Sequence, residues 1–241
     1  MQARVGSTRL PAKVLKEILG KTVLEHDLER CLRIRKVDGI IIATTNEPEA
    51  DKIIQICALF PADKVKFYRG SIEDVLSRYY ESALMVQAQT IIRLTSDCPL
   101  LDPLLVDDMI ETFMEKRRQS PPLDYLCNTN PRTFPQGLDT EIFTFSTLER
   151  AFLQAKDPYE REHVTPYIRR HPEIFTFENF SQSVDQSSYR WTLDYPEDFE
   201  FIKLVYESLY PQNPAFDRHD IVTLLKEHPE IQSINANRRQ R

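Results

Sequence analysis

Residues 39–45 read Gly-Ile-Ile-Ile-Ala-Thr-Thr, a short, uninterrupted and largely β-branched run. Such a run is typical of a strand that is buried on both faces of a parallel sheet. Residues 90–95, Thr-Ile-Ile-Arg-Leu-Thr, have the same character, and residues 64–68 alternate like a third strand. Helical patterns lie between these runs, so strand and helix alternate through the first half of the chain. This alternation predicts an α/β fold with a mostly parallel sheet and helices on both of its faces.

Helix start patterns separate the expected strands. Thr22-Val23-Leu24-Glu25 matches a capping box, in which a hydroxyl and a carboxylate three residues later satisfy free backbone N–H groups. The helix that it opens carries apolar residues at helical spacing. Further helices are expected over about 47–59, 71–87 and from Pro103 onward. The second half is less regular, with strands expected at 125–128, 141–145, 175–180 and 189–193, helices at 146–155, 160–170, 195–210 and 217–227, and a frayed tail at 235–241.

Composition narrows the function classes. The length of 241 residues suits one domain with its own core. The net charge is -6, and this mildly acidic balance gives no sign of the basic surface that nucleic-acid binding needs. Four cysteines show no C-x-x-C spacing, which indicates neither a zinc site nor a small disulfide framework. No apolar run approaches the roughly 18 residues of a membrane span. We therefore expect a cytoplasmic protein with no nucleic-acid partner and no membrane partner.

Residues 2–13, Gln-Ala-Arg-Val-Gly-Ser-Thr-Arg-Leu-Pro-Ala-Lys, form the most unusual polar stretch. Three cations, two hydroxyl side chains and one glycine lie within these twelve residues. Guanidinium forks, an ammonium group and closely approaching backbone N–H groups are what a triphosphate needs. Each charge-assisted contact contributes about 1.5–3 kcal/mol. The stretch is not a Walker A loop, and a solvated basic loop is the alternative interpretation.

Two aspartates are candidate metal ligands because each follows a strand-like run. Asp97 follows residues 90–95, and Asp194 follows residues 189–193. Ligands of open α/β sheets bind at the carboxyl ends of the strands, and Mg²⁺ typically takes one or two protein carboxylates plus phosphate oxygens. The two aspartates are therefore expected to share one Mg²⁺, with helix capping as the alternative for Asp97. Asp102, directly before Pro103, fits a capping role.

Five further polar side chains are candidates for ligand contacts. Asp139 and Glu141 flank one residue of an expected strand, so both carboxylates point to one face, where they could bind sugar hydroxyls or meet solvent. His163 could bind a sugar or have a structural role. Arg69 and Asp74 could contact the base or ribose, although capping also explains Asp74.

Six ordered motifs together resemble the cytidylyltransferases that activate acidic sugars. That family includes the acylneuraminate and 3-deoxy-manno-octulosonate cytidylyltransferases, and the chain most resembles the spore-coat polysaccharide biosynthesis protein F-like branch. The resemblance spans nearly the whole chain. The motifs are residues 2–13, Arg69-Gly70-Ser71 with 73–76 and 78–80, Arg93-Leu94-Thr95 with 97–100, Gly137-Leu138-Asp139 with Glu141, residues 161–168, and residues 190–194 with 196–198.

The resemblance implies a Rossmann-like three-layer α/β sandwich of the nucleotide-diphospho-sugar transferase type. It implies a single domain over 1–241, with a sugar-binding and dimerisation extension within about 124–190, and a homodimer. The implied reaction joins CMP from CTP to a sugar and releases pyrophosphate, with Mg²⁺ as cofactor. The implied catalytic residues are Arg4, Lys13 and Asp97, and the implied metal ligands are Asp97 and Asp194. The implied nucleotide-binding residues are Arg4, Gly6, Ser7, Arg9, Lys13, Arg69 and Asp74. The implied sugar-binding residues are Asp139, Glu141 and His163.

The sequence departs from the family pattern in two places. The family has an apolar strand directly before the Gln-Ala-Arg motif, whereas only Met1 stands there in this sequence. Without that strand, neighbouring strands would have unpaired backbone groups, each costing about 1–3 kcal/mol if buried. The family often has glycine where this chain has Ala12, which matters if the position needs a positive φ. A non-catalytic nucleotide-binding module and a glycosyltransferase are the alternative functions.

Overall fold

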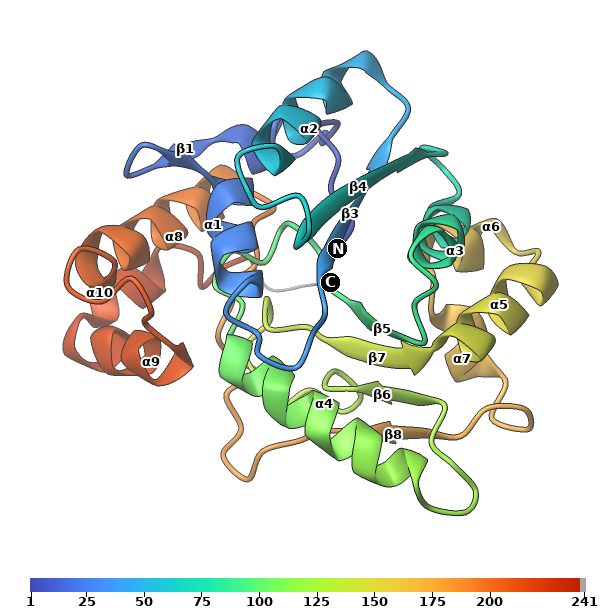
Figure 1. The fold of residues 1–241 in the computed structure, drawn as a ribbon. Coiled ribbons are helices and arrows are strands. Elements are labelled where there is room, and N and C mark those ends of the chain that lie inside the picture. Colours follow the sequence, from blue (N-terminus) through green and yellow to red (C-terminus); the bar gives the residue numbers. More distant parts are fainter. Residues whose placement is uncertain (239–241) are drawn as a thin grey trace.

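A twisted sheet runs through the middle of the molecule, and helices pack on both of its faces (Figure 1). The computed structural model describes residues 1–238. Strands β3 (Ile40–Thr45) and β4 (Val65–Gly70) pair in parallel. Gln2 bridges in parallel to Ala43 of β3 and to Thr95, just beyond β5 (Thr90–Arg93). The amino-terminal residues thus lie between β3 and β5 and join them into one parallel layer.

The second half of the sheet is mixed. Strand β7 (Glu141–Thr144) pairs antiparallel with β5 and with β6 (Tyr125–Cys127). Strand β8 (Phe177–Asn179) pairs in parallel with β6. The parallel arrangement predicted from the sequence therefore holds from β4 to β5, and β7 reverses the direction beyond them.

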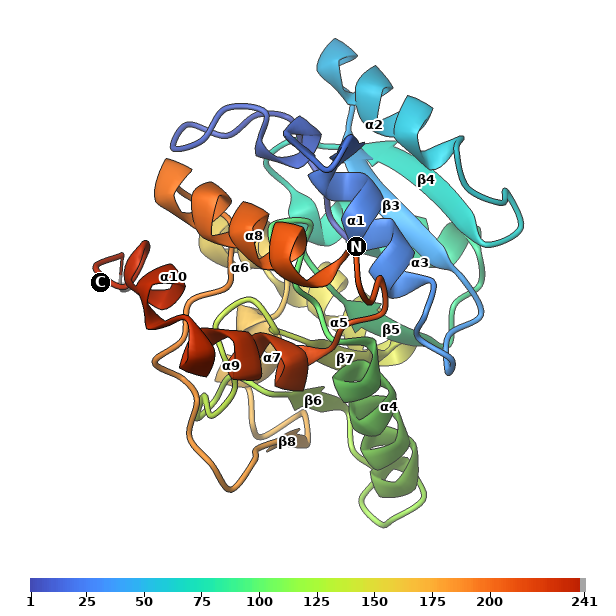
Figure 2. The ribbon, with the colours of Figure 1, turned by 90° about the vertical axis from the view of Figure 1, so that its left-hand side faces the viewer.

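Two hydrophobic cores fill the space between the sheet and its two helical layers. The larger core gathers side chains from six helices, and Figure 2 shows the last three of them facing the viewer. These six helices are α1 (Val23–Cys31), α2 (Asp51–Cys57), α4 (Pro103–Arg117), α8 (Pro196–Leu209), α9 (Arg218–Glu227) and α10 (Pro229–Ser233). The second core lies on the opposite face under α3 (Val75–Met85), α5 (Phe145–Gln154), α6 (Pro158–His163) and α7 (Pro166–Arg170). The predicted three-layer, Rossmann-like α/β sandwich is confirmed.

Local sequence patterns placed several elements correctly. The Thr22 hydroxyl accepts a hydrogen bond from the Glu25 N–H, and the Glu25 carboxylate accepts one from the Thr22 N–H, which is the predicted capping box. Asp102 caps α4 and Asp217 caps α9. All four cysteines are free and buried. Within residues 1–238, none of the helices combines the length and the apolar character that crossing a membrane requires.

Three predicted elements were wrong in detail. The helix expected from residue 71 begins at Val75, because Asp74 caps it by accepting the Ser77 N–H. The helix expected over 160–170 is broken into α6 and α7, because Val164 has φ 72 between them. Residues 189–193 form no strand; Arg190 makes only an isolated bridge to Gln136.

Four short elements were not anticipated. These are the strands β1 (Glu17–Ile18) and β2 (Lys21–Thr22), which form a hairpin, the 3-10 helix η1 (Lys13–Leu15), and α10. The helix expected over about 47–59 consists of the 3-10 helix η2 (Pro48–Ala50) followed by α2. The tail predicted to be frayed is anchored at Asn235, whose side chain is buried and donates to the Arg190 carbonyl. Residues 239–241 of that tail lie outside the described residues.

Candidate active site

Lys13 stands at the centre of the candidate site. Its Nζ donates to Asp97 Oδ2 at 3.0 Å, to Asp194 Oδ1 at 3.0 Å and to the Leu193 carbonyl at 2.7 Å. Asp97 follows β5, and Asp194 comes two residues before α8. The two aspartates that the sequence singled out, 97 positions apart, therefore converge on one ammonium group. They do so at the carboxyl edge of the parallel strands, where ligands of such sheets bind.

The charges of this cluster reinforce one another. Burial alone would raise the pKa of Asp97, but the charge of Lys13 and hydrogen bonds from Thr95 and Lys13 outweigh it and hold that pKa below its ordinary value. Burial likewise would lower the pKa of Lys13, and the two carboxylates raise it instead. Lys13 and Asp97 are therefore both ionised at neutral pH.

A second network fixes the direction of Asp194. Arg190 donates to both oxygens of Asp198, at 2.8 and 2.7 Å, and Asn235 donates to the same carboxylate at 2.9 Å. The Asp198 carboxylate in turn accepts the backbone N–H groups of Asp194 and Tyr195, both at 3.0 Å. A buried carboxylate at the start of α8 thus orients the segment that carries Asp194.

The predicted phosphate loop curves past this cluster and stays open to solvent. Arg9 donates to Asp194 Oδ1 at 2.9 Å while its side chain remains 53% exposed. Arg4 is exposed and forms no ion pair with any residue from 1 to 238. A Cβ added at Gly6 would meet nothing within 4 Å, and the Ser7 hydroxyl accepts the Leu10 N–H at 3.4 Å. Backbone and side-chain donors of this loop are thus available to an anionic ligand.

Ala12, at the end of that loop, adopts a left-handed conformation with φ 53 and ψ 32. It stands directly before Lys13 and is the N-cap residue of η1. A residue with a Cβ costs about 1–2 kcal/mol in this region. The position therefore does need a positive φ, which is the condition under which glycine would be favoured.

Arg69 and Asp74, predicted to contact the nucleotide, already have protein partners. Arg69 donates to the Glu47 carbonyl at 2.8 Å and to Asp51 at 2.6 Å, and so links the carboxyl ends of β3 and β4. Asp74 caps α3 and pairs with Arg161, whose Nε lies 3.0 Å from Oδ2. These contacts account for both side chains in structural terms, and their nucleotide-binding role stays a prediction.

Two of the three predicted sugar-binding residues lie at accessible positions. Asp139 is half-buried and pairs through both oxygens with Arg132, one contact being 2.7 Å. His163 is exposed at the end of α6, and its ring lies 4.4 Å from that of Tyr159. Both side chains are accessible to a ligand from solvent.

Glu141 differs from both. It is 7% exposed, and its oxygens accept from Tyr125, from the Thr165 hydroxyl at 2.6 Å and from Arg93. The expectation that it shares an open face with Asp139 is therefore wrong, because β7 is buried along its whole length. This arrangement supports a structural role for Glu141 beneath the site and gives no direct contact with a sugar.

Arg78 lies in one of the six family-like motifs, but no role was predicted for it from the sequence. This arginine of α3 is 2% exposed, and its Nε and Nη1 have no hydrogen-bond partner among residues 1–238. Burial, with a smaller effect of Arg4, lowers its pKa. Gly70 makes room for it, because a Cβ at Gly70 would lie 2.7 Å from Arg78 Cγ. A buried cation without a partner at the end of β4 is an anion-binding candidate.

Asp27 was also not identified from the sequence as an unusual residue. It is fully buried on α1, and neither of its carboxylate oxygens has a partner in the described part of the chain. Burial first, and then the charge of Asp97, raises its pKa well above the ordinary value. The sequence did contain a clue, because Asp27 lies three residues after Leu24 and four before Cys31, on the apolar side of the helix.

Comparison with known proteins agrees with this geometry. A family model described as cytidylyltransferase matches residues 1–218. The chain is 32% identical to the spore coat polysaccharide biosynthesis protein SpsF of Bacillus subtilis, over 95% of this chain and 94% of that protein. A solved cytidylyltransferase structure from Leptospira borgpetersenii is 35% identical and superposes with a TM-score of 0.88, covering 96% of this chain and 94% of that one. A 3-deoxy-manno-octulosonate cytidylyltransferase of Chlamydia trachomatis is 25% identical over 73% of this chain and 68% of that protein.

Fold, site and relatives together define a nucleotidyltransferase. The chain belongs to the cytidylyltransferase family. Within that family it falls in the SpsF-like branch, as its motifs predicted.

Proposed function

We propose that this protein transfers CMP from CTP to an acidic or keto-deoxy sugar, releasing pyrophosphate, in the synthesis of a surface polysaccharide or other glycan. The observation that carries the proposal is the convergence of Asp97 and Asp194 on Lys13, beside the open loop with Arg4 and Arg9. Cations on one side and paired carboxylates on the other suit a nucleoside triphosphate that arrives with a divalent cation.

The donor set fits Mg²⁺. This ion prefers oxygen ligands and takes one or two carboxylates while substrate phosphates and water complete its shell. Asp97 and Asp194 supply two such carboxylates, and both share Lys13 as their partner. Residues 1–238 contain no grouping of three or more His, Cys, Asp or Glu side chains suited to a metal. When bound, Mg²⁺ would neutralise charge on the phosphates.

The chain's own residues position the triphosphate and neutralise its charge. Arg4 and Arg9 present guanidinium forks at the edge of the loop, and Lys13 lies where its ammonium group can exchange a carboxylate for a phosphate oxygen. A sugar hydroxyl oxygen then forms a bond to the α-phosphorus and gives up its proton to water, and the bond from that phosphorus to the oxygen bridging to the β-phosphorus breaks, so that pyrophosphate leaves. Catalysis of this kind depends on orientation and on donors fixed in advance.

The sugar class rests on the relatives, whose names refer to polysaccharide biosynthesis and to 3-deoxy-manno-octulosonate. Asp139 and His163 are the side chains that we propose for sugar contact. The region 124–190 that carries them also exposes apolar side chains, which supports our proposal that it forms the homodimer interface. These side chains are Leu153, Tyr159, Phe177 and Val184.

The test offers the protein each of the four nucleoside triphosphates with Mg²⁺ and a panel of acidic and neutral sugars, and follows pyrophosphate. The proposal expects release that requires both CTP and one acidic acceptor. CTP binding with no pyrophosphate from any acceptor would favour a non-catalytic nucleotide-binding module. Release of nucleoside mono- or diphosphate from a nucleotide sugar would favour glycosyl transfer.

A further inference from the structure

The guanidinium group of Arg78 carries a buried charge that the described part of the chain leaves without a counter-charge. The residue is 2% exposed, and its Nε and Nη1 are buried with no hydrogen-bond partner among residues 1–238. An arginine keeps its charge even when it is buried. Because an uncompensated buried charge is strongly destabilising, the position indicates a partner that is supplied from outside the chain.

The end of β4 is shaped around the Arg78 side chain. A Cβ at Gly70 would lie 2.7 Å from Arg78 Cγ and 3.5 Å from Arg78 Cδ, so the stem of the arginine leaves no room for a side chain there. Gly70 is the last residue of β4 and pairs with Thr45, the last residue of β3. Arg78 therefore lies at the carboxyl ends of two neighbouring parallel strands, the edge at which ligands of such sheets bind.

Two carboxylates act on Arg78 through their charge, and both are engaged with other groups. Burial lowers the pKa of Arg78, and the charges of Asp74 and Glu47 offset this only in part. The Asp74 carboxylate caps α3 and pairs with Arg161. The Glu47 carboxylate accepts the hydroxyl of Thr45 at 2.9 Å. Neither of them bonds to the Arg78 guanidinium, which stays free to bind another anion.

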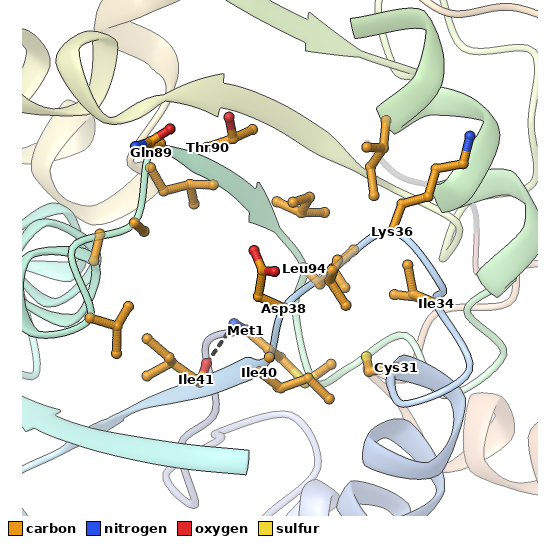
Figure 3. Close-up of a pocket in the computed structure, with 18 of the residues that line it drawn as sticks. Met1, Cys31, Ile34, Lys36, Asp38, Ile40, Ile41, Gln89, Thr90 and Leu94 are labelled. Carbon is orange, nitrogen blue, oxygen red and sulfur yellow. Dashed lines mark hydrogen bonds between the residues drawn. The ribbon is translucent and has the colours of Figure 1, made fainter. Parts of the chain in front are cut away.

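The cavity that adjoins α3 does not solvate this guanidinium. The cavity has a volume of 980 Å³, and Ile40 and Ile41 of β3 line it, as Figure 3 shows. It reaches α3 at Tyr79 and Ser82, but Arg78 is not among its lining residues. Water in this cavity therefore cannot take the place of the missing partner of Arg78.

Arg4 adds a second cation beside Arg78. After burial, the charge of Arg4 also lowers the pKa of Arg78, and Arg4 forms no ion pair within residues 1–238. The other two cations of the phosphate loop, Arg9 and Lys13, both bond to Asp194. The loop thus presents one group of cations that is joined to carboxylates and another that is not. The second group suits an anion, because guanidinium groups form strong, charge-assisted hydrogen bonds to phosphate oxygens.

We propose that Arg78 and Arg4 bind the pyrophosphate part of the nucleoside triphosphate, the group that leaves when CMP is transferred. This assignment rests on the proposed function, in which the α-phosphate meets Mg²⁺ at Asp97 and Asp194. The two phosphates beyond it then need cations that these carboxylates do not engage. When the bond to the α-phosphorus breaks, its electron pair stays with the pyrophosphate, and donors fixed in advance stabilise such developing charge.

The experiment measures binding by calorimetry, in the presence of Mg²⁺, for CTP, CMP and inorganic pyrophosphate separately. In Arg78→Met, the affinities for CTP and for pyrophosphate should fall about tenfold or more, whereas the affinity for CMP should stay within about twofold. The matched control is Arg150→Met. Arg150 is exposed on α5, 5.6 Å from the centre of the Phe175 ring, so this variant loses the same charge at a solvent-screened position. All three of its affinities should stay within about twofold of those of the unaltered protein.

Three results would overturn the inference. An equal loss of affinity for CMP and CTP would assign Arg78 to the base, the ribose or the α-phosphate. Unchanged affinities in Arg78→Met would exclude the contact, and so would an unaltered protein that does not bind pyrophosphate. If Arg78→Met does not fold, Arg78→Lys takes its place in the test. Lysine keeps the charge but lacks the planar fork, so this variant should lose more affinity for pyrophosphate than for CMP.

The binding test separates this inference from the proposed function, because it uses neither a sugar nor turnover. Pyrophosphate that binds through Arg78, in a protein that releases none with any sugar, would retain the inference and contradict the proposed function. Pyrophosphate release that requires CTP and an acidic sugar, with no effect of Arg78→Met on binding, would do the reverse.

Discussion

Replacing Lys13 by methionine removes the charge at the centre of the site while keeping an unbranched chain of similar length. The Lys13 side chain is 13% exposed, and its two carboxylate partners are 31% and 13% exposed. In the Lys13→Met protein the two carboxylates lose the cation that they share, Asp194 keeps its contact with Arg9, and the Leu193 carbonyl loses its donor.

The expected loss of stability follows from that burial. Removing one member of a fully buried ion pair costs about 3–5 kcal/mol. Because Asp97 is nearly a third exposed, solvent screens part of the effect, and we expect a loss of about 2–3 kcal/mol in the free energy of unfolding. The pKa of Asp97, which Lys13 holds down, should rise. Mg²⁺ should stabilise the variant more than it stabilises the unaltered protein, since both carboxylates are then free to bind it.

The rate of pyrophosphate release should fall by more than the loss of stability explains. A donor aimed at transition-state charge contributes about 2.7–4 kcal/mol, which is a factor of about 10²–10³ in kcat. Urea denaturation with and without Mg²⁺ measures the first effect, and pyrophosphate release below the unfolding transition measures the second. The matched control is Lys16→Met, since Lys16 lies 4.8 Å above the Phe199 ring and pairs with no carboxylate in residues 1–238. Its loss of stability should stay near 0.5–1 kcal/mol, and its activity should be unchanged.

The reasoning fails if Lys13→Met and Lys16→Met behave alike. Full activity in the Lys13 variant would show that the ammonium group does not meet the triphosphate. Unchanged stability would show that the two carboxylates do not depend on it for their charge balance.

Three further predictions follow from single features of the structure. Ala12→Gly removes about 1–2 kcal/mol of left-handed strain and adds about 0.5–1 kcal/mol of chain entropy, so urea denaturation should show a gain of up to about 1 kcal/mol; a loss would contradict the positive φ. Arg78→Met should weaken CTP binding, measured by calorimetry, about tenfold or more without lowering the melting temperature, because the Nε and Nη1 of the guanidinium have no protein partner within residues 1–238. An unchanged affinity for CTP would show that Arg78 is not part of the site. The Met1 amine has a pKa of about 6 in the folded chain against 8.0 ordinarily, so the unfolded chain binds the proton first as the pH falls, and the free energy of unfolding should drop by about 2 kcal/mol between pH 8 and pH 6; the drop should be absent when that amine is acetylated.

Patterns that depend on neighbours in the chain could be predicted from the sequence. The capping box at Thr22, the caps at Asp102 and Asp217, and the buried strand at 40–45 each arise within a few residues, and the structure confirms them. The sequence also singled out Asp97 and Asp194, and the structure brings both to Lys13 although residues 189–193 form no strand. Their metal-binding role, like the phosphate-binding role of residues 2–13, stays a prediction.

Features that depend on distant partners could not be predicted. The antiparallel direction of β7 depends on the path of the chain after β6, and the break at Val164 depends on how α6 and α7 pack against α3 and α5. Lys13 reaches Asp97 and Asp194 only in the folded molecule, and the orphaned Arg78 is recognisable only once burial is known. The alternating pattern predicted that Glu141 faces a sugar or solvent, whereas in the structure both faces of β7 are buried.

The most direct test of the account follows the α-phosphate of CTP itself. The protein is incubated with CTP labelled at the α-phosphorus, Mg²⁺ and the acidic sugar panel, beside a protein carrying both Asp97→Asn and Asp194→Asn. The label should move into a CMP-sugar, with one pyrophosphate released for each label transferred, and the double variant should lose at least about two orders of magnitude in rate. Label that stays in CTP with every acceptor, or transfer that is equally fast in the double variant, would contradict it.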